Sequence, residues 1–60
     1  MTTNEFDQMH WRKGMKILVS FLGTEIETEI IQVDFEKREV LVRVTTIIMK
    51  RIEYDKIKLL

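Results

Sequence analysis

The alternation of residues 25–33 constrains the fold of this chain more than any other feature of its sequence. Charged side chains alternate with apolar or hydroxyl side chains, as expected for a β-strand with one solvent face and one core face. The two faces are Glu25, Glu27 and Glu29 against Ile26, Thr28 and Ile30. The alternation then changes phase at Ile30-Ile31, and a slip of one residue exchanges the two faces of a strand. A β-bulge near residues 30–31 accounts for this change and predicts the sharp bend that a long strand needs in a small barrel.

Four more segments have the composition of short strands, rich in β-branched and aromatic residues. They cover residues 15–22, 39–44, 47–52 and 57–60. The expected core faces of the first two segments are Ile17, Val19 and Phe21, and Val40, Val42 and Val44. Together with residues 25–33 they make five strands, a number and spacing typical of a small β-barrel or sandwich.

Turn-forming residues mark some of the connections between these strands but not all of them. Gly23-Thr24 predicts a tight turn, and residues 54–56 are predicted as a single 3₁₀ turn. No Gly, Pro, Asn or Asp lies between residues 35 and 54, so Thr45-Thr46 is only a weak break. The position of the turn between the third and fourth strands stays open, and one long bent strand is an alternative to two.

Residues 1–14 are predicted as an N-terminal arm or a short helix that docks on a barrel formed by residues 15–60. Phe6, Met9 and His10 have the i, i+3, i+4 spacing of one helical face, with Thr3 or Asn4 as the cap. A helix of about two turns is not stable alone, so it has to dock or stay disordered. The predicted fold is all-β, a five-stranded SH3-like small barrel with a short N-terminal helix.

The residue types present exclude most kinds of chemistry. The chain has no cysteine and one histidine, so a disulfide, a thiolate metal site and a histidine-rich metal site are ruled out. No phosphate loop, nucleophile elbow or metal signature is present. We expect no enzyme activity, no catalytic residue, no cofactor and no bound metal.

The expected location is the cytoplasm. No segment approaches the roughly 18 apolar residues that a membrane span needs, so no membrane partner is expected. The first seven residues lack the basic start and apolar run of a signal peptide. Absence of cysteine fits a reducing compartment. A chain of 60 residues also buries little surface, which favours self-association as additional support.

Residues 15–34 resemble the first sequence motif of the Sm family. Apolar residues precede a glycine, others follow it, and an aspartate stands eleven residues after the glycine. The matching positions are Ile17, Val19 and Phe21, then Gly23, then Ile26, Ile30 and Val33, and finally Asp34. The short helix and the segment from Tyr54 to Ile57 are also similar to bacterial Sm-like RNA chaperones.

The resemblance implies an SH3-like barrel that binds RNA as a homo-oligomer. It is partial, because Thr28 replaces the second glycine of the motif and the Arg-Gly of the second Sm motif is absent. Tyr54-Asp55-Lys56 stands in place of the Lys-His that bacterial members use for RNA. A Tudor-like module in the same superfamily fits nearly as well.

The charge distribution suggests where nucleic acid would bind. The net charge is zero, but residues 1–34 carry three bases and six acids, whereas residues 35–60 carry seven bases and four acids. The predicted nucleic-acid-binding residues are Arg12, Lys13, Arg43, Lys50 and Arg51. In the N-terminal arm, Trp11 is interpreted either as a stacking residue or as a cover for an open end of the barrel. The glutamates are interpreted as a solvated face that pairs across strands with Arg43, Lys50 or Arg51.

A second set of apolar residues occupies the alternate strand positions, which are expected to face away from the core. The predicted protein-interface residues are Leu18, Ile31, Leu41, Ile47 and Met49. Exposed together they would mark an interface, whereas strand bending could equally bury them in one enlarged core. The chain is therefore expected to be a non-enzymatic binding module, with RNA binding as a homo-oligomer as the first hypothesis. The alternative is a regulatory or phage-type adaptor that binds a protein through an apolar sheet face or an edge strand.

Overall fold

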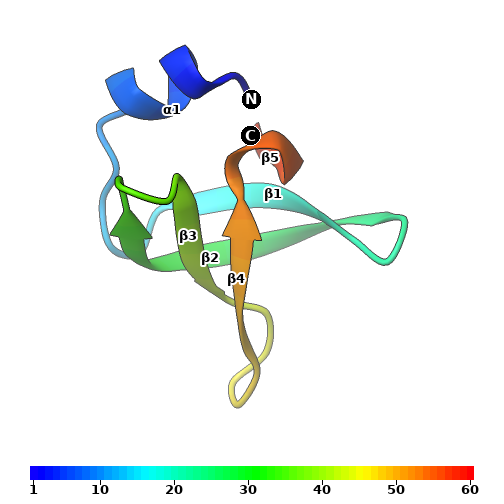
Figure 1. Ribbon diagram of the computed structural model, residues 1–60. Coiled ribbons are helices and arrows are strands. Elements are labelled where there is room, and N and C mark those ends of the chain that lie inside the picture. The colour runs from blue at the N-terminus through cyan, green and yellow to red at the C-terminus, as the bar shows by residue number, and fades with distance from the viewer.

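The computed structural model describes all 60 residues, as one antiparallel sheet with a short helix at one end (Figure 1). The strands are β1 Lys16–Phe21, β2 Thr24–Asp34, β3 Glu39–Arg43, β4 Met49–Glu53 and β5 Ile57–Leu59. Their order in the sheet is β4-β3-β2-β1-β5. The five-stranded all-β expectation is confirmed. The sheet is open rather than a closed barrel, because no hydrogen-bonded pairing joins β4 to β5.

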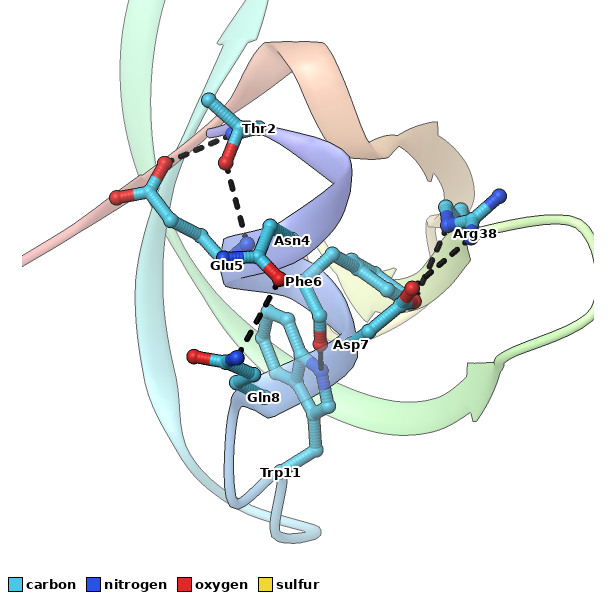
Figure 2. A network of polar contacts seen from close by, with 8 residues as sticks. All are labelled: Thr2, Asn4, Glu5, Phe6, Asp7, Gln8, Trp11 and Arg38. Atoms are coloured by element: carbon cyan, nitrogen blue, oxygen red, sulfur yellow. Dashed lines mark hydrogen bonds and ion pairs between the residues drawn. The ribbon is translucent and has the colours of Figure 1, made fainter.

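The helix α1, Thr3–Gln8, begins one residue earlier than the sequence suggests. The expected cap at Thr3 or Asn4 is wrong, because Thr2 and Glu5 form a capping box. The Glu5 N–H donates to Thr2 Oγ1 at 3.1 Å, and the Thr2 N–H donates to Glu5 Oε1 at 2.8 Å (Figure 2). Met9 already has extended backbone, so Met9 and His10 lie outside the helix and Phe6 is its one buried residue.

The predicted bulge in β2 is confirmed. Ile30 pairs with Val42, and the next pairing joins Gln32 to Leu41, so Ile31 has no opposite residue on β3. Because of this extra residue, the apolar side chains that follow the bend still face the core.

The turn between β3 and β4, which the sequence left open, occupies residues 44–48. Thr45 Oγ1 accepts from the N–H groups of Ile47 at 3.4 Å and Ile48 at 3.1 Å. The threonine hydroxyl stabilises this turn without Gly, Asn or Asp. One long bent strand is therefore wrong, and the fourth strand begins at Met49 rather than at residue 47. The 3₁₀ turn is confirmed as η1, Tyr54–Lys56.

The core lies between α1 and one face of the sheet. Its buried apolar residues are Phe6, Ile17, Val19, Ile30, Val40, Val42, Ile52 and Ile57. Thr28 is buried among them, and its hydroxyl donates to the Ile17 carbonyl at 3.4 Å. Phe21, expected in the core, is only half-buried, because it lies at the end of the β1–β2 hairpin opposite Thr24.

Aromatic packing and one ion pair hold α1 against the sheet. The Phe6 ring lies 5.1 Å from that of Trp11 and 5.8 Å from that of Phe35, and the Trp11 indole donates to the Phe6 carbonyl at 3.0 Å. Arg38, in the turn between β2 and β3, donates two hydrogen bonds to the Asp7 carboxylate, at 2.9 and 3.1 Å (Figure 2). This bond pair joins residues 31 positions apart in the chain.

Asp7→Asn is expected to remove a contribution to stability that is present at neutral pH and lost in acid. The hydrogen bond from Arg38 lowers the pKa of Asp7 below its ordinary 3.8. A carboxyl whose pKa is lower in the folded than in the unfolded protein stabilises the folded state. This contribution is complete above the unfolded-state pKa and is lost as the pH falls through the folded-state pKa. The melting temperatures of wild type and Asp7→Asn should therefore differ at neutral pH and converge below pH 3.8.

Circular dichroism melts across this range measure the difference. Arg38→Gln is the matched variant on the other side of the pair and should converge with wild type in the same way. A gap that persists unchanged at pH 2, roughly two units below the ordinary Asp pKa, would show that the ion pair is not its source.

Candidate functional site

Two of the predicted basic residues lie together on the outer face of the sheet. Arg43 of β3 pairs with Met49 of β4, and Leu41 of β3 pairs with Arg51 of β4. Arg43 and Arg51 are therefore diagonal neighbours on adjacent strands, on the face opposite Val42 of the core. Both are exposed, and neither forms a salt bridge.

Lys50 lies on the other face of the same strand. It pairs with Val42 in the register of β3 and β4, which places it on the core side at the edge of the sheet. Its ammonium lies 5.7 Å from the centroid of the Phe21 ring, a cation–π contact. The structure thus separates Lys50 from Arg43, although all three bases belong to one hairpin.

The remaining two predicted bases precede the sheet. Arg12 and Lys13 are exposed in the segment between α1 and β1. This segment is anchored by hydrogen bonds from the Gly14 N–H to the Ile30 carbonyl at 2.8 Å and from the Met15 N–H to the Arg12 carbonyl at 3.1 Å. These bonds place Arg12 and Lys13 beside the bend of β2 and not on the β3–β4 hairpin.

The glutamates of β2 face the outer side of the sheet together with Arg43. Glu29 lies opposite Arg43 on one side and Lys16 on the other, and Glu25 forms a salt bridge with Lys58 at 3.9 Å. Lys50 and Arg51 are not opposite any of the three glutamates in the register. The glutamates do not combine with other acids or with histidine into a cluster that could hold a metal ion.

The predicted protein-interface residues do not form one patch. Leu18, Leu41 and Met49 share the outer face by register, but β2 with its glutamates separates Leu18 from the other two. Ile31 is the bulge residue and is partly buried. Ile47 lies in the β3–β4 turn instead of a strand, with 86% of its surface exposed.

A cleft that the sequence did not reveal lies between the β1–β2 turn and β4. It has a volume of about 400 Å³ and is lined by Ser20, Phe21, Leu22, Gly23, Lys50, Arg51, Ile52, Glu53 and Lys56. An aromatic ring and three bases with one acid meet here from parts of the chain about 30 residues apart. A larger and shallower hollow of about 500 Å³ beside Glu25 and Asp55 has mixed charge and no aromatic residue.

The backbone at the mouth of this cleft is unusual. The predicted turn at Gly23-Thr24 has its two central residues at Leu22 and Gly23, with φ of 52° and 77°. Both lie in the left-handed region, as a two-residue turn of this hand requires. Glycine adopts that conformation freely, whereas for leucine it costs roughly 1–2 kcal/mol.

The outer strand β4 has an unpaired edge, whereas in β5 the Ile57 carbonyl accepts a hydrogen bond from the Met1 ammonium at 3.1 Å. The β3–β4 hairpin has hydrogen bonds from the Val44 N–H to the Ile48 carbonyl and from the Tyr54 N–H to the Arg38 carbonyl. Because hydrogen-bonded pairs alternate along an antiparallel ladder, the N–H groups of Met49, Arg51 and Glu53 point away from β3. On the opposite side of the sheet, β5 ends at the exposed Leu59, and the exposed Leu60 follows it.

Comparison with known proteins adds no relative. No family model, curated protein or solved structure matches the chain. The single helix, of six residues, is too short to cross a membrane.

Proposed function

We propose that this chain is a non-enzymatic, cytoplasmic RNA-binding module that works as a homo-oligomer. The observation that carries the proposal is the charge of the β3–β4 hairpin. From Val40 to Ile52 the chain holds three bases, Arg43, Lys50 and Arg51, and no acid. None of the three is in a salt bridge. Arg43 donates one hydrogen bond to the Thr46 carbonyl at 3.5 Å, and Lys50 contacts the Phe21 ring, so each keeps donors for an anionic partner.

Two arginines that are free of salt bridges and lie on adjacent strands suit phosphate recognition. A guanidinium donates parallel hydrogen bonds to phosphate oxygens, and such contacts position a nucleic acid without selecting a base. Arg43 and Arg51 would contact neighbouring phosphates along one backbone, since they are diagonal neighbours on one face. The zero net charge means that attraction comes from this hairpin and not from the whole molecule.

Self-association is supported by the two open edges of the sheet. Unpaired edge strands favour pairing with another chain. β4 presents such an edge, and β5 presents one beyond Ile57, whose carbonyl accepts from the Met1 ammonium at 3.1 Å. Pairing β4 of one copy with β5 of the next uses two different surfaces, so it can repeat until a ring closes. The partial resemblance of residues 15–34 to the first Sm motif supports the same assembly.

Arg43→Ala together with Arg51→Ala is expected to weaken RNA binding and its salt dependence. If each arginine neutralises one phosphate of single-stranded RNA, the slope of log affinity against log salt should fall by about 1.4 per bound protomer. Affinity should drop by about tenfold or more at roughly 50 mM salt. Fluorescence anisotropy of a labelled single-stranded RNA, measured over a salt series, provides both values.

The control is Lys16→Ala with Lys37→Ala, which removes the same charge from exposed residues outside the hairpin. Equal losses in the two double variants would mean that only overall charge matters. Unchanged binding in the arginine variant would remove these two residues from the interface.

The second candidate function is a protein adaptor. It is favoured by the β3–β4 turn, where Ile47 is almost fully exposed and Ile48 and Met49 are also exposed. Binding of a protein through this apolar tip would change little with salt, whereas RNA binding would weaken steeply. The same salt series therefore separates the two functions.

A further inference from the structure

We propose that the cleft between the β1–β2 turn and β4 binds an unstacked RNA base against Phe21, with the adjoining phosphates on Lys50 and Lys56. This inference rests on the proposed RNA-binding function and assigns it a site. The site was not among the residues predicted from sequence, apart from Lys50 and Arg51.

The ring of Phe21 is placed for contact with a ligand. It is half-buried at the end of β1, beyond the residues that form the core, so one part of it faces the cleft. A base of single-stranded RNA binds proteins largely by stacking on such aromatic side chains. The ammonium of Lys50 lies over the ring, 5.7 Å from its centroid, so a base that stacks on this face displaces the ammonium towards the phosphate of the same nucleotide.

The charge of the cleft fits an anionic ligand. Its lining includes three bases and the acid Glu53, but Arg51 and Glu53 lie on the outer face by register, so Lys50 and Lys56 are the bases left for the ligand. Lys50 and Lys56 are exposed and free of salt bridges, so binding a phosphate breaks no ion pair, and Lys50 exchanges its contact with the Phe21 ring for the phosphate. A volume of about 400 Å³ lies in the range of small-molecule sites.

Leu22 is a second and independent observation at the same place. It has 88% of its surface exposed and lies in the left-handed region, where a leucine is unfavourable. Neither its backbone nor its burial explains a leucine here, because glycine or asparagine would suit the turn better. Strained residues cluster at ligand contacts, although Arg38 has a similar φ of 53° in a turn outside the cleft. Leu22 can cover the apolar face of a base that stacks on Phe21.

The site favours single-stranded over double-stranded RNA. In a duplex, neighbouring bases cover the faces of each base, and the A-form helix is recognised by its shape and its backbone. A single ring inside a cleft can stack only on a base that has left the helix. Duplex RNA would still meet the exposed arginines of the outer face.

The test compares two Phe→Leu variants in binding a labelled oligouridine. Phe21→Leu keeps the apolar volume and removes the aromatic face, while Phe35→Leu makes the same change at an exposed ring in the β2–β3 turn. Phe21→Leu should weaken binding by at least about fivefold, which is the low end of measured base stacking. The factor should be similar at low and moderate salt because stacking involves no charge. Phe35→Leu should bind as wild type does, and melting curves should show that both variants are folded.

The outcomes separate this inference from the function on which it rests. If the wild type binds oligouridine and Phe21→Leu binds it equally well, the cleft is not the binding site. The same conclusion follows if both variants weaken binding equally. Either result leaves the proposed RNA-binding function in place. A wild type that binds neither oligouridine nor duplex RNA at low salt overturns both. Equal affinity of wild type for oligouridine and for duplex RNA also contradicts the cleft, since only the outer face would then be in use.

Discussion

Phe6→Ala is expected to remove a large part of the protein's stability at neutral pH. Phe6 is fully buried and packs against the rings of Trp11 and Phe35, so removing it leaves a cavity between α1 and the sheet. Truncation of a buried phenylalanine to alanine costs about 3–5 kcal/mol of unfolding free energy. A chain of 60 residues has a total stability of roughly 3–9 kcal/mol, so this loss is at least about a third of it.

Urea unfolding followed by circular dichroism and by tryptophan emission measures this loss. Trp11 is the only tryptophan, and its indole is bonded to the Phe6 carbonyl, so its emission reports directly on the docking of α1. Phe35→Ala is the comparison, because Phe35 is more than half exposed and its loss should cost less than about 1 kcal/mol. If Phe6→Ala shifts the midpoint no more than Phe35→Ala does, α1 is not an integral part of the core.

Arg51→Pro is expected to convert a homo-oligomer into monomers. The Arg51 N–H points away from β3, so proline there removes a donor from the free edge and leaves the β3–β4 ladder intact. The proline ring also blocks the approach of a neighbouring strand. Arg51→Ala removes the same charge and keeps the N–H, so it should remain assembled.

Light scattering at two protein concentrations gives the masses of wild type and both variants. Circular dichroism should show a folded sheet in each, because no core residue changes. A wild type that is monomeric at both concentrations would contradict self-association. An Arg51→Pro variant that stays assembled would place the interface elsewhere than on β4.

Self-association and RNA binding would use different atoms of β4, so substitutions can alter them separately. Chain pairing would use backbone groups in the plane of the sheet, whereas RNA would meet the side chains of Lys50 and Arg51 above and below that plane. Arg51→Ala should therefore reduce RNA binding in an assembled protein. Arg51→Pro should reduce both.

Local pattern was sufficient to predict the strands and the bulge. Alternation of side chains has a period of two in a strand, so the phase change at Ile30-Ile31 is visible without any knowledge of neighbours. The turn at residues 44–48 was not predictable in the same way. It depends on hydrogen bonds from a threonine hydroxyl, and Thr45 is also an ordinary strand residue.

The amino-acid sequence by itself determined an all-β chain with a bulge in its second strand, because alternation and its change of phase are properties of neighbouring residues. Only the tertiary structure decided that the sheet stays open with β4 and β5 at its edges, and that Lys50 and Arg51 face opposite sides. It also decided that Phe21 meets Lys50, although 28 residues separate them in the chain. No sequence spacing encodes such a meeting, since it follows from how two hairpins twist and approach each other in space.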